Sequence, residues 1–218
     1  MTPPARQKVS RPSSSVQVST LDTQHSRPPP LSASTLGASC FGGGEGSIGA
    51  DGSIYVTCDN DFSSRLQAYS PAGEPKWIRS LGSTNGTHTP LIDATGTIYV
   101  ANSGSVNALS AEGTIIWKLD GLFRNNVEPV IDAARNVYII AETKSLFGTS
   151  LMVVNDGKVV ENRGPLNGDY YGALLLTASG RVYYNSAGSL IYFQASGADA
   201  SAPWNQMGGD AGRTESLK

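Results

Sequence analysis

Aspartates recur at three similar places in this chain and are the first candidates for chemistry. Asp51, Asp93 and Asp132 each precede a strand-like segment that carries a tyrosine, so they look like a recurring acid set. An aspartate in such a turn commonly accepts hydrogen bonds from nearby backbone amides, and that role involves no reaction. We therefore expect all three to be structural turn residues.

The other polar side chains form no known catalytic or metal-binding motif. His25 and His88 lack the paired spacing of a zinc site. The run Asp59-Asn60-Asp61 supplies three oxygen side chains, as a calcium loop does, but it lacks the glycine and the distal glutamate of an EF-hand loop. A solvated turn is the favoured interpretation. We expect no catalytic residue, no metal site and no cofactor-binding residue.

The two cysteines leave the redox compartment open. Cys58 lies in a predicted strand, where a small buried thiol is the expected state, and a disulfide with Cys40 is the alternative. Residues 36–40, L-G-A-S-C, faintly resemble a bacterial lipoprotein cleavage site, but the apolar segment that should precede them is missing. We find no apolar run long enough for a signal-peptide core or a transmembrane span.

A repeat must position these residues. Four tyrosines, each in a short apolar strand after a turn, lie 44, 39 and 45 residues apart: Tyr55, Tyr99, Tyr138 and Tyr183. A period of this size indicates a supersecondary unit that stacks on copies of itself. Each copy contains four strand-like segments separated by glycine or asparagine turns, which is typical of a β-propeller blade. A β-sandwich, the competing fold, does not require internal copies. The expected blades are 46–82, 87–121, 127–165 and 171–218.

The repeat resembles the pyrroloquinoline-quinone-like (PQQ-like) β-propeller family. The pattern D-x-x-G-x-I-Y-V, followed by L-x-A-L-S-x-x-G-x-x-x-W, fits residues 92–117 most fully. In that family the tryptophan docks between blades, which implies this role for Trp77 and Trp117. The third copy has Val160 near the tryptophan position, and the fourth has Thr177 in place of the aspartate. The tail 202–214 also resembles the carboxyl end of such proteins.

Composition agrees with a turn-rich β protein. The chain has 25 glycines, 39% hydrophobic and 16% charged residues, and a formal net charge of −2. This charge predicts no general attraction to nucleic acid or to anionic membrane. Residues 1–45 are rich in proline and serine, and we expect a disordered tail or linker there. A targeting peptide and a mis-assigned start are the alternatives.

The leading functional hypothesis is a non-catalytic propeller module that binds or scaffolds a protein or another ligand. The resemblance implies two alternatives: a quinoprotein dehydrogenase holding PQQ with calcium, and a scaffold like the bacterial outer-membrane β-barrel assembly lipoprotein. It also suggests a periplasmic or extracellular location. Partner-binding loops are expected at Phe123, Arg124, Tyr170 and Tyr171. Both terminal blades should expose apolar faces, so self-association, with two open arcs completing an eight-bladed ring, is a further expectation.

Overall fold

The regular structure of the chain consists of β-strands. The computed structural model describes residues 46–60, 63–82, 86–123, 127–143, 146–166, 172–186, 189–197, 202 and 206. Within these ranges every regular element is a strand, and all of them belong to one compact unit, residues 34–218. The expected tail, residues 1–45, lies outside the described residues.

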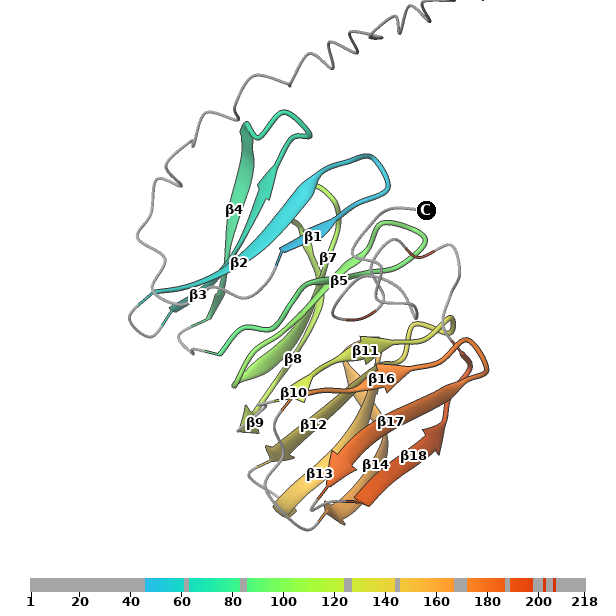
Figure 1. Ribbon diagram of the computed structural model, residues 1–218. Helices are drawn as coiled ribbons and strands as arrows, with labels where there is room; N and C mark the ends of the chain where they lie inside the picture. The colour runs from blue at the N-terminus through green and yellow to red at the C-terminus, as the bar shows by residue number, and fades with distance from the viewer. Residues whose placement is uncertain are drawn as a thin grey trace, which may run out of the picture. The chain divides into compact units, whose positions relative to one another are not determined.

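Four antiparallel sheets follow one another along the chain, and we call them blades 1 to 4 (Figure 1). Blade 1 consists of β1 (Gly46–Ile48), β2 (Ile54–Asn60), β3 (Ser63–Tyr69) and β4 (Pro75–Gly82). Blade 2 consists of β5 (Leu91–Ile92), β6 (Ile98–Ala101), β7 (Ser105–Leu109) and β8 (Ile115–Asp120). Blade 3 consists of β11 (Val130–Ile131), β12 (Val137–Thr143), β13 (Leu146–Asn155) and β14 (Lys158–Leu166). Blade 4 has three strands, β16 (Leu175–Leu176), β17 (Arg181–Ser186) and β18 (Ser189–Gln194).

Short strands also link neighbouring blades. After blade 2, β9 (Leu122–Phe123) pairs with β12 of blade 3. The next strand, β10 (Val127–Glu128), pairs in parallel with β15 (Gly172–Ala173), which leads into blade 4. The four-copy repeat in the sequence does not predict these pairings.

The repeat tyrosines occupy equivalent positions, which confirms the predicted register. Each tyrosine lies in the second strand of its blade and pairs with a residue of the first strand: Tyr55 with Ser47, Tyr99 with Leu91, Tyr138 with Val130, and Tyr183 with Leu175. Because side chains alternate along a strand, every blade has two distinct sides. We call the side with the tyrosine the tyrosine face, and the opposite side, rich in Ile and Val, the aliphatic face.

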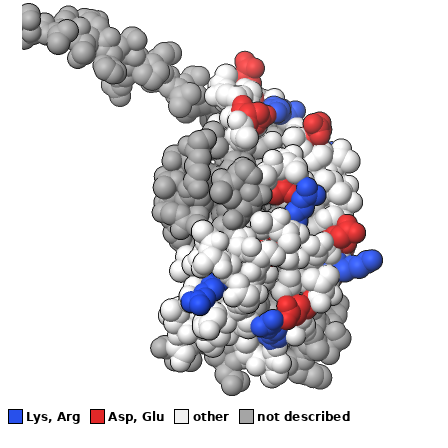
Figure 2. All heavy atoms as spheres, turned by 90° about the vertical axis from the view of Figure 1, so that its right-hand side faces the viewer, with Lys and Arg blue, Asp and Glu red and all other residues white. Residues whose placement is uncertain are grey.

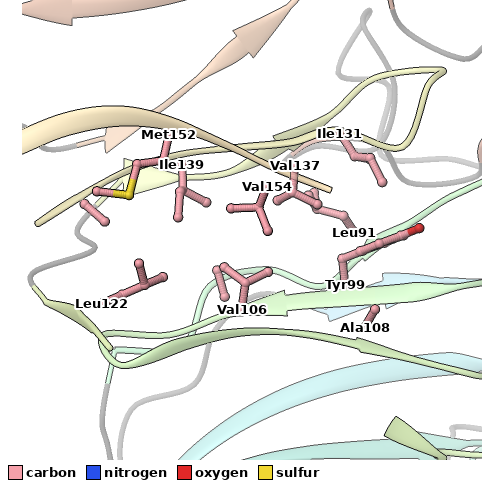
Figure 3. Packing of buried hydrophobic residues seen from close by; sticks show 12 residues of the cluster. Leu91, Tyr99, Val106, Ala108, Leu122, Ile131, Val137, Ile139, Met152 and Val154 are labelled. Atoms are coloured by element: carbon pink, nitrogen blue, oxygen red, sulfur yellow. The ribbon is translucent and has the colours of Figure 1, made fainter. Parts of the chain in front are cut away.

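Each tyrosine face packs on the aliphatic face of the following blade. Three buried clusters show this order, one between blades 1 and 2, one between blades 2 and 3, and one between blades 3 and 4. Figure 3 shows the middle cluster, where Tyr99 and Val106 of blade 2 face Val137 and Ile139 of blade 3. Within the ranges the structure describes, none of the three clusters joins blade 4 to blade 1.

Candidate functional site

The turn aspartate of blade 2 connects its own turn, its own tyrosine and the next blade. Asp93 is buried, and its Oδ1 accepts hydrogen bonds from the amides of Thr95 and Thr97, at 2.8 and 3.0 Å. The Tyr99 hydroxyl donates to Asp93 Oδ2 at 3.0 Å. Arg135 of blade 3 places its Nε 3.4 Å from the same oxygen. Burial, followed by the negative charge of Asp93, raises the pKa of Tyr99.

Blade 3 repeats this arrangement. Asp132 Oδ1 accepts from the amides of Ala134 and Asn136, both at 2.9 Å, and its Oδ2 accepts from the Tyr138 hydroxyl at 2.9 Å. The amide of Ser196, which follows blade 4, also donates to Asp132 Oδ2, at 3.2 Å. The predicted structural role of the turn aspartates is confirmed at both sites.

Asp51 differs from the other two aspartates in position. It lies four residues before its tyrosine, whereas Asp93 and Asp132 lie six before theirs, and Gly49 occupies the equivalent place in blade 1. Asp51 still accepts hydrogen bonds from the Ser53 amide at 3.0 Å and the Ser53 hydroxyl at 2.7 Å. The hydroxyl contact is the main cause that lowers the pKa of Asp51. Its role is therefore also structural, although it is not the equivalent of Asp93.

Asp59 was expected in a solvated turn, and this expectation is wrong. It lies at the end of β2, and its carboxylate accepts hydrogen bonds from the amides of Gly86 and Thr87, at 2.8 and 3.1 Å, and from the Thr87 and Ser64 hydroxyls. The carboxylate thus holds the connection between blades 1 and 2. Residue spacing in the sequence does not predict this role. Asp61 lies outside the described residues.

His88 lies buried at the connection between blades. Its Nδ1 lies 3.2 Å from Glu128 Oε1 in the connection before blade 3. Glu128 Oε2 accepts from the Thr89 amide at 3.0 Å. In the described part of the chain, His, Cys, Asp and Glu side chains do not gather in groups of three or more around a common point.

The two repeat tryptophans lie at blade contacts, as the resemblance implies, and each ring is partly buried there. Trp77 packs on the cluster between blades 1 and 2, and its Nε1 donates to the Ala111 carbonyl of blade 2 at 2.9 Å. Trp117 packs on the cluster between blades 2 and 3. In blade 3 the strand register places Glu161, and not Val160, at the tryptophan position, opposite Val153.

Cys58 is buried in β2 and is disulfide-bonded, so the expected free thiol is not what the structure contains. The other cysteine, Cys40, lies outside the described residues. The expected partner-binding residues Arg124, Tyr170 and Tyr171 lie outside them as well, and Phe123 is described only as a strand residue that pairs with Glu142. The loop hypothesis therefore stays a prediction.

Across the described ranges we find no helix with the length and apolar character needed to cross a membrane.

The tyrosine face of blade 4 has no described blade packed on it. Leu175, Tyr183 and Tyr192 lie side by side across the three strands of this blade. Leu175 is 42% exposed and Tyr192 is 55% exposed, and Leu190 on the same face is 70% exposed. In blades 1 to 3 this face is covered by the next blade. Sequence reasoning expected an exposed terminal face but did not identify these residues.

Aromatic and cationic side chains cluster on this open face. The rings of Tyr183 and Tyr192 lie 5.7 Å apart, and the Arg181 guanidinium lies over the Tyr192 ring at 5.0 Å. Arg181 Nη1 also donates to the Tyr183 hydroxyl at 3.4 Å. Tyrosine and arginine are enriched among the residues that contribute most to protein interfaces. The cluster is therefore a candidate contact surface.

The aliphatic face of blade 1 is the complementary surface at the other end of the repeat. Ile54 and Val56 point to this side and are half-buried. Gln67 pairs with Val56 on one neighbouring strand and with Ile78 on the other, so Ile78 lies on the same face, and it is 56% exposed. On the molecular face drawn in Figure 2, acidic and basic side chains are interspersed and form no large patch of one sign. Among the surfaces described, the tyrosine face of blade 4 therefore stands out by its exposed apolar residues and not by charge, and the aliphatic face of blade 1 contributes Ile78.

Comparison with known proteins identifies the fold class. No protein-family model matches the chain, and no curated protein matches it. BamB from Moraxella catarrhalis is similar in structure, with a TM-score of 0.53 and 18% identity over 69% of this chain and 49% of that protein. The β-propeller domain of Cps50 (Swd1) from Myceliophteria thermophila gives a TM-score of 0.52 and 12% identity over 70% of this chain and 54% of that domain. The four sheets are thus blades of a β-propeller fold, and the chain spans about half the length of these two structures.

Proposed function

We propose that this chain is a non-catalytic β-propeller module of the PQQ-like repeat type, which associates with protein through its terminal blade faces. The observation that carries the proposal is the open tyrosine face of blade 4, with Leu175, Leu190 and Tyr192 exposed. Exposed apolar surface of this kind, rimmed by polar residues, is typical of protein interaction sites. The fold itself does not select a function, so the proposal depends on this surface.

The geometry of Trp77 supports the PQQ-like assignment. Its ring lies against Gly113 of the next blade, where an added Cβ would approach Trp77 Cδ2 to 2.8 Å. Its Nε1 donates to Ala111 in the same turn. This is the docking of a tryptophan between blades that the sequence resemblance implies.

The occupant that we propose for the open face is the aliphatic face of blade 1 in a second copy of the chain. Within one copy, an aliphatic face covers a tyrosine face at each of the three blade contacts. The aliphatic face of blade 1 leaves Ile78 exposed and Ile54 and Val56 half-buried. A second copy therefore supplies the type of surface that the tyrosine face of blade 4 lacks.

Two such contacts would close a ring. If blade 4 of each copy packs on blade 1 of the other, the two contacts are related by a two-fold axis, and the ring contains four blades from each chain. Closure removes both exposed faces, which open repeat arrays otherwise leave at their ends. The expected particle has twice the 22.8 kDa mass of the chain.

Sedimentation velocity over about a hundredfold range of protein concentration tests this proposal, since association depends on concentration by mass action. We expect a monomer–dimer equilibrium with no larger species, because a closed two-fold ring has no free face. Leu190→Arg on blade 4 and Ile78→Arg on blade 1 should each weaken dimerisation by at least about tenfold. Val160→Arg is the matched control, because Val160 is 59% exposed but lies on β14 of an interior blade.

A monomer at every concentration would contradict the proposal and would favour a longer protein in which further blades cover these faces. Dimerisation that Leu190→Arg and Ile78→Arg leave unchanged would place the interface elsewhere. Circular dichroism of each variant shows whether the sheets still form, which separates loss of association from loss of folding.

The absence of enzymatic activity forms part of the proposal and has its own test. The buried carboxylates Asp93 and Asp132 are occupied by hydrogen bonds that hold turns and blades together, which supports a structural role for both. We propose that the protein holds neither PQQ nor calcium. Isothermal calorimetry with PQQ and calcium, followed by a dye-linked dehydrogenase assay, should give no binding and no turnover. Micromolar binding with turnover would support the quinoprotein alternative.

A further inference from the structure

A cavity lies at the turn end of the contact between blades 2 and 3. Its volume is about 380 Å³, within the range of small-molecule sites. Its lining includes Tyr99, Ile116, Trp117, Arg135, Asn155 and Asp156. The cavity is distinct from the terminal faces, since it belongs to an interior contact of the repeat.

A shortened turn accounts for this cavity. In blade 2 five residues, 110–114, separate β7 from β8, whereas in blade 3 only Asp156 and Gly157 separate β13 from β14. The longer turn supplies the carbonyl acceptor and the close glycine on which Trp77 docks. At the shorter turn, a Cβ added to Gly157 would lie 3.7 Å from the Trp117 ring at Cε3, compared with 2.8 Å between a Cβ on Gly113 and the Trp77 ring at Cδ2. Trp117 is therefore docked less closely.

The looser docking leaves the indole N–H of Trp117 available. Trp77 Nε1 donates to Ala111, but the described residues offer Trp117 Nε1 no acceptor, and the ring contact of Trp117 is with Tyr99 at 5.9 Å. An indole presents a flat apolar surface and one donor, and the donor usually finds a partner when the ring is covered. A bound molecule would supply that partner.

Arg135, whose guanidinium lines the same cavity, has a left-handed backbone conformation that disfavours arginine. Three residues before the repeat tyrosine, blades 1, 2 and 4 have glycine with φ of 79°, 83° and 84°, at Gly52, Gly96 and Gly180. Blade 3 has Arg135 there, with φ of 64°. A residue with a Cβ is disfavoured in this left-handed conformation, and such strain concentrates at functional sites.

The charged groups at the cavity are Arg135 and Asp156 in its lining and Asp93, which pairs with Arg135. Arg135 is half-exposed and uses its Nε toward buried Asp93, which leaves its terminal nitrogens without a described partner. Asp156 is exposed, and Asn155 uses its Nδ2 on Ala134 and Asn136, so its Oδ1 remains as an acceptor. Because Asp93 already offsets the charge of Arg135, the cavity offers no net attraction for an anionic ligand. The set favours a neutral ligand that has both donors and acceptors.

We propose that this cavity is a carbohydrate-binding site for one or two sugar rings. The apolar C–H side of a pyranose fits the flat surface of Trp117, and the exposed Ile116 extends that surface. Adjacent hydroxyl groups, each a donor and an acceptor, match the planar groups of Arg135 and Asp156 and the free oxygen of Asn155. The small number of polar contacts leads us to expect dissociation constants of about a millimolar.

Saturation-transfer NMR with a panel of methyl glycosides and neutral disaccharides tests the site on the full chain. We expect transfer to at least one sugar of the panel. Arg135→Gly should abolish it. Glycine relieves the left-handed strain but also removes the Arg135 contact of Asp93, so circular dichroism of the variant checks that the sheets still form. Asp156 is also left-handed, with φ of 47°, and Asp156→Asn keeps a residue that tolerates this conformation and should weaken binding at least about tenfold.

Arg79→Ala is the matched control. It removes a guanidinium at the contact between blades 1 and 2, where Arg79 Nε donates to the Gly113 carbonyl at 2.7 Å, and it leaves the cavity intact. Sugar binding should persist in this variant. The proposal is overturned if no sugar of the panel gives transfer, if Arg135→Gly binds as well as the wild type, or if free amino acids bind in the same assay and the sugars do not.

Discussion

The hydrogen-bonded pair of turn aspartate and repeat tyrosine connects neighbouring blades. At Asp93 one buried carboxylate receives the Tyr99 hydroxyl from its own blade and lies 3.4 Å from the Arg135 guanidinium of the next blade. Such a group contributes to stability only while all its partners are present, because an unsatisfied buried acceptor carries the full cost of desolvation. The same residues that form the hairpin turns therefore also connect the blades.

Tyr99→Phe should lower the free energy of unfolding by about 1.5–3 kcal/mol, since it removes a buried hydrogen bond to a charged group and leaves Asp93 Oδ2 only its contact with Arg135. Urea titration at neutral pH measures this change. Tyr183→Phe is the control: its hydroxyl accepts only a 3.4 Å contact from Arg181 on the open face, and we expect a change within about 0.5 kcal/mol. Equal effects of the two variants would contradict the role given to Asp93.

Stability should also fall at alkaline pH. The pKa of Tyr99 in the folded chain is raised above 10.0, first by burial and then by the charge of Asp93, and that of Tyr138 is raised by burial and by Asp132. A raised folded pKa means that the stabilisation is fully present below pH 10.0 and is lost as pH rises above it toward the folded pKa. Unfolding midpoints measured from pH 8 to about 11.5 should therefore decline in the wild type and decline less in Tyr99→Phe. A parallel decline in both proteins would show that Tyr99 ionises freely.

At the scale of strands and turns, equivalent positions in different blades make different contacts. The turns of blades 1 and 2 both contain a left-handed glycine, Gly73 with φ of 83° and Gly113 with φ of 80°. A Cβ on Gly73 would meet nothing within 4 Å, whereas one on Gly113 would overlap the Trp77 ring at 2.8 Å. Only the second turn is part of a blade contact.

Gly73→Ala should cost about 1–2 kcal/mol, from backbone strain alone. Gly113→Ala should cost about 1–3 kcal/mol more, because the added methyl group also displaces Trp77. Thermal or urea unfolding of the two variants side by side measures the difference. If Gly113→Ala were no worse than Gly73→Ala, Trp77 would not be docked on this turn.

The two tryptophans should differ in the same sense. Trp77→Ala loses the packing of a partly buried ring and the hydrogen bond to Ala111, for which we expect about 2–4 kcal/mol. Trp117→Ala loses packing without a described hydrogen bond, and the expected cost is lower by about 1 kcal/mol. Denaturant titration of both variants checks the order. The reverse order would indicate that Trp117 is the better docked ring.

The sequence predicts the repeating part of this fold well, because period and alternation are local properties. The tyrosine spacing gives the second strand of every blade, and the turn aspartates 93 and 132 have the expected backbone contacts. Contacts across the chain are harder to predict. The Asp59 carboxylate reaches Thr87, and His88 reaches Glu128, through connections that differ between copies and leave no periodic signal. Arg135 carries a local signal, a bulky residue where three copies have glycine, which a comparison of the four turns detects.

At the scale of the whole molecule, the account depends on how the two terminal faces are used. The chain spans about half the length of the propellers it resembles, and each blade contact it contains pairs a tyrosine face with an aliphatic face. The tyrosine face of blade 4 remains open, and the aliphatic face of blade 1 leaves Ile78 exposed. The second copy that we propose would cover both faces without any new kind of contact.

Hydroxyl-radical footprinting of the associating protein tests this claim most directly. Oxidation rates of Leu190 and Tyr192 on blade 4, and of Ile78 on blade 1, are measured by mass spectrometry at low and high protein concentration. The account predicts that these three residues become protected together as the dimer forms, while Val160 on blade 3, which is equally exposed in the monomer, keeps its rate. Dimer formation without protection of Leu190 and Tyr192 would contradict the account.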